Sequence, residues 1–268
     1  MDHAKVVLIT GASSGFGKLT AEQLVPKGYR VFGTSRKESL DIHGIEMLAL
    51  DVRSEDSVRQ CVKQVMERAG RIDVLINNAG YGLGGFVEET SIGQSEALFA
   101  TNFFGVVRVT QAVLPIMRGQ NSGRIINVGS LAGLIGVPCA AFYVASKFAL
   151  DGFTESLRLE VDQFHIQVSI IEPSFFKTNI ANSVEVGNQL NRAYDSIREK
   201  VERAFQKEVE SGEDPSQVAQ LIARITETKH PKLRYRVGRD AVWIPRLKSV
   251  IPGKIFSYVL KRQFNLIS

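Results

Sequence analysis

Short apolar runs alternate with amphipathic segments along most of this chain, and the alternation constrains its fold more than any other feature. In residues 54–69, for instance, apolar side chains recur with a helical period, and Ser54 and Gly70 are suited to begin and end a helix. Strands separated by helices predict a parallel sheet with right-handed crossovers and helices on both faces. The runs expected as strands are residues 6–10, 29–34, 45–50, 72–76, 124–128, 166–171 and 233–237.

The same pattern sets the limits of the domain. Beyond Pro173 the alternation breaks, and residues 175–212 form a long, polar, mostly helical insertion that we expect to be a substrate lid. Because no repeat or Gly/Ser-rich linker divides the chain, we expect residues 1–268 to form one doubly wound Rossmann-type α/β domain of about seven strands. Helices are expected from the first glycines to about Lys27 and at residues 54–69, 95–117, 142–164 and 215–228.

Composition excludes several classes of protein. The chain is 44% hydrophobic and 23% charged, as in an ordinary soluble domain. Two cysteines cannot form a disulfide framework, so a reducing, cytoplasmic setting is expected, and four scattered histidines argue against a metal site. The apolar run near the N-terminus is too short for a signal peptide, and we expect no membrane-spanning helix.

The net charge of +5 is unevenly distributed. Residues 229–268 hold ten Lys or Arg and one Asp, so they carry +9 and the first 228 residues carry −4. A mildly acidic body does not predict nucleic-acid binding. The basic and apolar tail, residues 241–268, is compatible with a membrane-surface helix. Packing over the substrate pocket or against another subunit is the alternative that we prefer.

A glycine-rich turn follows the first strand. The sequence Thr10-Gly11-Ala12-Ser13-Ser14-Gly15-Phe16-Gly17 spaces its glycines as GxxxGxG and opens a helix. Such a turn lets the helix N-terminus approach a pyrophosphate, whose negative charge the helix dipole favours. This context predicts a dinucleotide site.

The ends of the second and third strands bear on the choice of cofactor. Arg36 and Lys37 follow Ser35, where an acid would bind the ribose 2′-hydroxyl of NAD. Arg36 instead predicts a partner for the 2′-phosphate of NADP(H). Asp51, followed by Val52, is placed either to accept from the adenine amino group or to cap the next helix.

Candidates for chemistry follow later strands. Tyr143 and Lys147 are four residues apart on a predicted helix, so they share one face. A nearby ammonium favours the phenolate of a tyrosine, whose ordinary pKa is about 10. Ser130 follows the fifth strand, at the sheet edge where open α/β sheets bind ligands, and its hydroxyl is suited to hold a substrate oxygen. Asn102 lies within a predicted helix.

Together these residues resemble the classical short-chain dehydrogenase/reductase family over about residues 5–180. The resemblance implies that Tyr143 is the general acid/base and that Lys147 binds the nicotinamide ribose and lowers the tyrosine pKa. It implies that Ser130 positions the substrate oxygen and that Asn102 supports a proton-relay water. The matching pieces are TGASSGFG (10–17), NNAG (77–80), Asn102, Ser130, YVASK (143–147) and PSFFKT (173–178).

The resemblance extends to the cofactor. It implies that Asn78, Ala79 and Gly80 line the cofactor, and that the segment from Pro173, with the backbone near Phe176 and Thr178, holds the carboxamide. Pro173-Ser174 departs from the family's usual Pro-Gly, and serine adopts a positive φ less readily than glycine. We therefore expect this turn to differ locally.

The segment 233–241 resembles 17β-hydroxysteroid and retinol dehydrogenases of the family, which implies a bulky apolar alcohol or ketone. We therefore expect an NADP(H)-dependent oxidoreductase, working as a homodimer or homotetramer. A 3-oxoacyl or small-ketone reductase and a non-catalytic NADP(H)-sensing protein are the alternatives. Candidate pocket residues are Leu83, Leu131, Leu134, Val137, Phe142, Phe175, Phe176 and Phe205.

Overall fold

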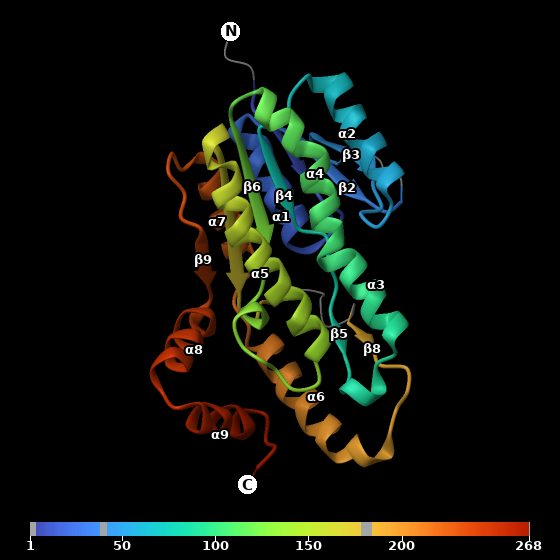
Figure 1. The fold of residues 1–268 in the computed structure, drawn as a ribbon, viewed down its shortest axis with the longest axis vertical. Coiled ribbons are helices and arrows are strands. Elements are labelled where there is room, and N and C mark those ends of the chain that lie inside the picture. The colour runs from blue at the N-terminus through green and yellow to red at the C-terminus, as the bar shows by residue number, and fades with distance from the viewer. Residues whose placement is uncertain (1–3, 38–41, 178–183, 268) are drawn as a thin grey trace.

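A seven-stranded, fully parallel sheet forms the centre of the computed structural model, which describes residues 4–37, 42–177 and 184–267 (Figure 1). The strand order is β3-β2-β1-β4-β6-β7-β9, with helices on both faces, so the predicted α/β class is confirmed. The chain reverses its direction of growth beside β1, which pairs with both β2 and β4. Ligands of such sheets bind beyond the carboxyl ends of the strands at this switch point. The strands are β1 Val6–Ile9, β2 Arg30–Ser35, β3 Ile45–Ala49, β4 Val74–Asn77, β6 Gly123–Val128, β7 Ile166–Pro173 and β9 Arg234–Val237.

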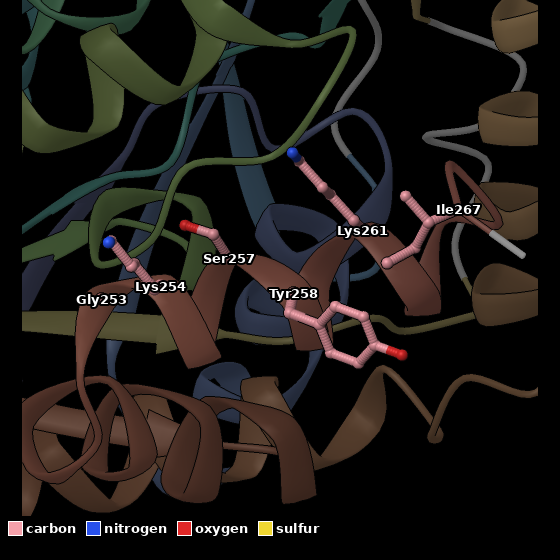
Figure 2. Close-up of a pocket in the computed structure, with 6 residues that line it drawn as sticks. All are labelled: Gly253, Lys254, Ser257, Tyr258, Lys261 and Ile267. Atoms are coloured by element: carbon pink, nitrogen blue, oxygen red, sulfur yellow. The ribbon is translucent and has the colours of Figure 1, made fainter.

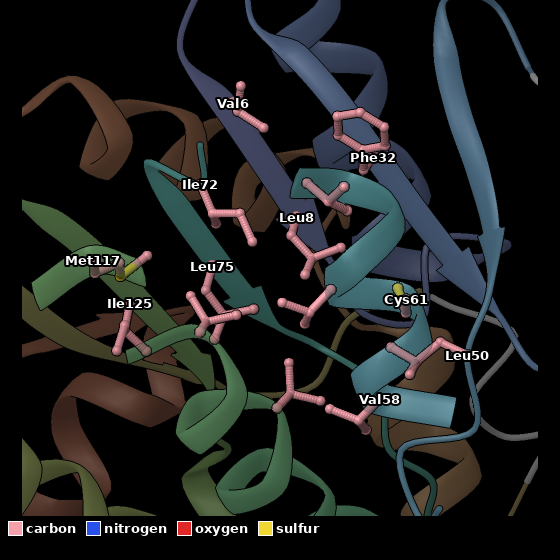
Figure 3. Close-up of a cluster of buried hydrophobic side chains, with 14 of the residues drawn as sticks. Val6, Leu8, Phe32, Leu50, Val58, Cys61, Ile72, Leu75, Met117 and Ile125 are labelled. Atoms are coloured by element: carbon pink, nitrogen blue, oxygen red, sulfur yellow. The ribbon is translucent and has the colours of Figure 1, made fainter. Parts of the chain in front are cut away.

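One face of the sheet is covered by α2 (Glu55–Ala69), α4 (Phe104–Gly119) and α5 (Ala141–Val161). Alternate strand residues such as Leu8 and Leu75 point to this face and are fully buried (Figure 3). As predicted, Ser54 caps α2 by accepting from the backbone N–H of Ser57, and Gly70 ends it with a positive φ.

The other face is covered by α1 (Gly15–Leu24) and α7 (Ser216–Glu227). The strand residues between those of the first face, such as Val7 and Ile9, pack against Leu24 and Ile222. A single turn of 3-10 helix, Val25–Lys27, completes the helical stretch that was expected to reach Lys27. The alternation of side chains along each strand therefore divides the core into two layers.

The prediction of one continuous helix at residues 95–117 is wrong. The segment is divided into α3 (Ile92–Asn102) and α4, because Phe103 leaves helical geometry with φ −120° and ψ −65°. No membrane-spanning helix was expected from the sequence. By length and composition alone, however, Ile92–Gly119 is long and apolar enough to span a membrane, with a mean hydropathy of 1.4 over 18 residues. A core helix passes the same test, and α4 packs Val109, Val113 and Met117 against the sheet.

The segment after β7 returns across the carboxyl end of the sheet. There β8 (Glu185–Val186) pairs in parallel with β5 (Leu83–Gly84), and α6 (Asp195–Glu210) follows. After β9, α8 (Arg239–Val250) and α9 (Gly253–Gln263) project from the body below the sheet (Figure 1). Residues 184–212 and residues 241–267 of the C-terminal tail thus both contribute to the end of the sheet that carries the predicted site.

Candidate active site

The glycine turn between β1 and α1 has the geometry of an anion cradle. Gly11 has a φ of +68°, and a Cβ atom on Gly17 would lie 2.3 Å from the Gly11 carbonyl oxygen, so only glycine fits there. The Asn78 amide holds the turn by donating to the carbonyl oxygens of Thr10 and Gly11 at 3.0 and 2.8 Å. The side chain of Ser14, the N-cap of α1, makes no capping hydrogen bond. The first N–H groups of α1 are therefore available to a pyrophosphate, and the turn fits a dinucleotide.

The outer end of this cradle is cationic. Arg36 is exposed just beyond β2, and its charge contributes to lowering the pKa of Asp51. The larger cause is Arg53, whose guanidinium donates to both Asp51 oxygens, at 3.0 and 2.7 Å. Asp51 does not cap α2, because Ser54 does so, which removes one of its two expected roles. Val52 is buried and packs on Gly105.

Ser130 and Tyr143 bring two hydroxyl groups together at the carboxyl end of β6. Ser130 opens a 3-10 turn, Leu131–Gly133, by accepting from the Ala132 N–H at 3.1 Å, and it is hydrogen-bonded to Tyr143 on α5. Burial raises the pKa of Tyr143, and the hydrogen bond with Ser130 opposes this increase. The expectation that Lys147 lowers the Tyr143 pKa is therefore not borne out: this pKa is raised overall, and the opposing effect comes from Ser130.

Lys147 lies one turn further along α5, on the same side as Tyr143. Its Nζ atom donates to the Val128 carbonyl oxygen at 3.0 Å and lies 5.8 Å from the centroid of the Tyr143 ring. The side chain is 8% exposed, and burial lowers the pKa of Lys147 to about 8. The sequence prediction that both side chains share one face of a helix is thus confirmed.

Asn102 is buried at the end of α3. Its Oδ1 accepts from the Tyr81 N–H at 3.0 Å, and its Nδ2 donates to the Tyr81 carbonyl oxygen at 2.9 Å. The same Nδ2 lies 3.5 Å from the Ser146 hydroxyl. Asn102 therefore fixes the loop after Gly80 against α5.

The turn after β7 closes the nicotinamide side of the site. Ser174 does not take a positive φ; the positive φ falls instead on Gly238, whose added Cβ would meet Ser174 Oγ at 2.0 Å. Phe176 packs edge-to-face on Phe16 at 5.7 Å and so joins this turn to the glycine turn. Thr178 lies outside the described residues.

A cavity of about 410 Å³ brings together the glycine turn, residues 78–80, Ser130, Tyr143, Lys147 and residues 173–176. Among the predicted site residues that the structure describes, those that do not line it are Ser13, Gly17, Arg36, Asp51, Val52 and Asn102. Leu134 and Phe142, two candidates for the pocket, do not line it. Apolar lining residues are Leu83, Leu131, Ile135, Val137, Phe175, Phe176, Val184, Val186, Val201, Phe205, Val209, Ile244, Leu260 and Phe264.

An ion pair in the wall of this cavity attaches α6 to the body. Arg198 of α6 donates to Glu89, whose side chain is fully buried in the turn after β5. Burial alone would raise the pKa of Glu89, but hydrogen bonds from Arg198 and from the backbone of Asn191 lower it overall. The expected lid is therefore attached by a buried charge as well as by apolar contacts.

Comparison with known proteins decides the family. Residues 5–189 match the model of the short chain dehydrogenases. The chain belongs to the short-chain dehydrogenase family. It is an oxidoreductase that interconverts CH–OH and C=O groups, and a nicotinamide dinucleotide is the cofactor of this fold.

Relatives of this short-chain dehydrogenase match over nearly their whole length. It is 42% identical to a 3-ketodihydrosphingosine reductase of Bacteroides thetaiotaomicron, over 96% of this chain and 97% of the relative. It is 37% identical to human retinol dehydrogenase 8, over 92% and 85%. A short-chain dehydrogenase from Streptomyces avermitilis superimposes with a TM-score of 0.82 at 37% identity, covering 92% and 94%. One from Burkholderia phymatum in complex with NAD gives 0.78 at 28% identity, covering 93% and 95%.

Sequence reasoning missed part of the site of this short-chain dehydrogenase. Glu89 and Arg198 carry no local signal, because they are 109 residues apart and resemble ordinary surface charges in the sequence. By contrast, the expected packing of the tail over the substrate pocket is confirmed, because Ile244, Leu260 and Phe264 line the cavity. Cys139 also lines the cavity, and burial raises its pKa to about 11, so its thiol is not a nucleophile at neutral pH.

Proposed function

We propose that this enzyme reduces a ketone or aldehyde on a bulky hydrophobic substrate with NADPH. The observation that carries the proposal is one cavity whose lining includes the glycine turn, Ser130, Tyr143 and many apolar side chains. An apolar cavity with few convergent polar groups is typical of a site that orients a hydrophobic ligand by one polar end.

The preference for NADP(H) rests on charge. Arg36 and Lys37 are both exposed beyond β2, and neither forms an ion pair with a carboxylate in the part of the chain that the structure describes, although the charge of Arg36 acts on Asp51. A guanidinium at this place suits the 2′-phosphate of NADP(H), which NAD(H) lacks. Asp51 lies next to these cations, held by Arg53, and is suited to meet the adenine amino group.

The roles of the reacting residues follow from their positions. The cofactor, when bound, supplies the hydride. Tyr143, which burial keeps protonated at neutral pH, donates its proton to the oxygen of the substrate, and Ser130 donates a hydrogen bond to the same oxygen. Lys147, positively charged at neutral pH, binds the ribose and stabilises negative charge on Tyr143 after the proton has left. Asn102 positions the loop beside them.

The relatives suggest which hydrophobic carbonyls to test first. A 3-ketodihydrosphingosine reductase and a retinol dehydrogenase both have names that denote long apolar substrates with one reacting oxygen. The apolar lining of the cavity accommodates such a chain better than a small ketone, which would leave most of that wall in contact with water.

The test is the rate of NADPH oxidation with a panel of carbonyl compounds. We expect the highest kcat/KM with 3-ketodihydrosphingosine, retinal or a steroid ketone, and a much lower value with NADH. Preference for 3-oxoacyl thioesters or small ketones would contradict the substrate assignment, and equal use of NADH would contradict the cofactor assignment. Tyr143→Phe, which removes only the hydroxyl, is the matched control: activity that this variant lacks arises at this site.

Two further expectations concern the setting of the enzyme. We propose that it acts in the cytoplasm as a homodimer or homotetramer. Phe104 on α4 and Phe148 on α5 are 49% and 42% exposed, and exposed rings on these two helices support their association with another copy of the chain. Sedimentation velocity would give the number of subunits.

A further inference from the structure

The two C-terminal helices carry large apolar side chains on their exposed side. On α8, Trp243, Leu247 and Val250 follow one another at helical spacing and are 67%, 41% and 82% exposed. On α9, Ile255 and Tyr258 are 52% and 53% exposed. Large exposed apolar groups gathered on neighbouring helices mark a binding surface.

Positive charge surrounds these apolar groups. Residues 241–268 contain five Lys or Arg and neither Asp nor Glu. No cation of residues 241–267, all of which the structure describes, pairs with a carboxylate. By contrast, Arg234 and Arg236 of β9 are neutralised by Glu172, Asp151 and Glu155. Among residues 229–267, the cations without a carboxylate partner are therefore Lys229 and Lys232 before β9 and six Lys or Arg residues on α8 and α9.

One side of α9 forms a shallow basic hollow. Lys254, Ser257 and Lys261 project from α9 to the same side, with Tyr258 and Ile267 completing the lining (Figure 2). Two ammonium groups on either side of a hydroxyl suit the phosphate of a lipid headgroup. On α8, Arg246 stacks on Trp243 at 5.5 Å, so a cation accompanies the exposed indole as well.

The opposite side of α9 is already occupied. Phe256 is buried against Leu131 and Ile135, and Leu260 and Phe264 line the substrate cavity. The exposed apolar groups are consequently not needed to close the cavity. They are instead a second apolar face on helices that form its wall.

We propose that α8 and α9 bind the surface of an anionic lipid bilayer, with Trp243 and Ile255 among the lipid chains and the lysines at the headgroups. Charge complementarity favours a bilayer over a second copy of this chain, because two copies of an unneutralised basic surface would repel each other. Bilayer binding would bring the wall of the cavity next to the phase in which hydrophobic carbonyl compounds dissolve. This inference concerns binding and does not depend on the proposed reaction.

The experiment uses the fluorescence of Trp243, the single tryptophan of the chain. Full-length protein is mixed with vesicles of phosphatidylcholine alone or of phosphatidylcholine with phosphatidylglycerol, the second set also with brominated acyl chains. We expect a shift of emission to shorter wavelength and bromine quenching with the anionic vesicles, and a weaker response at high salt. An emission spectrum unchanged by anionic vesicles would overturn the proposal.

Matched variants separate the causes. Each lysine near an anionic surface changes partitioning about fivefold, so Lys254→Gln/Lys261→Gln should weaken vesicle binding about 30-fold. Lys63→Gln/Arg118→Gln removes two exposed cations from α2 and α4, distant from α9, and should bind as wild type (Figure 1). An equal loss of vesicle binding in the two double variants would show that the lysines of α9 are not a specific binding surface, and would contradict the proposal. A blue shift that depends on protein concentration without vesicles would assign the surface to a second copy and also overturn the proposal.

Discussion

Replacing Lys147 with methionine should make the free enzyme more stable at neutral pH. Burial lowers the pKa of Lys147 from 10.5 to about 8, a difference that corresponds to about 3 kcal/mol of unfavourable free energy when the amine is charged in both states. Methionine keeps the apolar stem without the charge. It also leaves the Val128 carbonyl oxygen without its donor at 3.0 Å, a loss of about 1 kcal/mol. The net gain in the free energy of unfolding at pH 7 is therefore about 2 kcal/mol.

The stability that Lys147→Met gains over the wild type should decrease as pH rises. Between pH 8 and pH 10.5 the unfolded chain holds the Lys147 proton more tightly than the folded one, so the wild type gains stability as pH rises through this window. The advantage of the Lys147→Met variant should consequently disappear by the upper end. Taking the difference between the two proteins at each pH cancels the titration of other groups such as the buried cysteines.

Urea denaturation of both proteins across this pH range measures the difference. Lys63→Met, on the exposed side of α2, is the matched control and should change stability by less than about 0.5 kcal/mol. If Lys147→Met is less stable than the wild type at pH 7, or if the difference in their free energies of unfolding does not change with pH, burial of the Lys147 ammonium does not destabilise the fold as we expect. We also expect this variant to lose turnover, because the ammonium group serves the cofactor.

Three other predictions test separate parts of the site. Arg36→Asp should reverse the preference between NADPH and NADH, which the ratio of kcat/KM values for the two would show; unchanged NADPH affinity would remove Arg36 from the site. Glu89→Gln leaves Arg198 without its buried carboxylate. Because a charged hydrogen bond is lost, proteolysis within residues 184–212 should become about tenfold faster. Cleavage at the wild-type rate would show that the ion pair does not hold α6 on the body. Phe264→Ala should raise KM for a long hydrophobic carbonyl and leave KM for a small ketone nearly unchanged, since Phe264 lines only the apolar wall; equal effects on both would place it elsewhere.

The central sheet was predictable because its signal is local. Val6–Ile9 is entirely apolar, and Ile166–Pro173 has five apolar residues among eight, which is typical of strands covered on both faces. The glycine turn and the Tyr143–Lys147 pair were predictable for the same reason, since each depends on spacing within one element.

The remaining features depend on contacts between distant residues. The break at Phe103 accompanies the hydrogen bonds of Asn102 to the Tyr81 backbone, 21 residues away, which no helical period records. The apolar wall of the cavity combines α6, α8 and α9, which are distant from one another in the sequence or from the sheet that they cover. Likewise, only the pairing of β9 with β7 brings Gly238, which has a positive φ, next to Ser174.

The turnover of Tyr143→Phe with a long-chain 3-keto substrate tests the account most directly. The variant lacks only the hydroxyl that meets Ser130, so we expect it to fold, to bind NADPH as the wild type does, and to lose about two or more orders of magnitude in kcat. A variant that binds NADPH and still reduces the substrate at a rate close to that of the wild type would contradict the assignment of this cavity as the catalytic site.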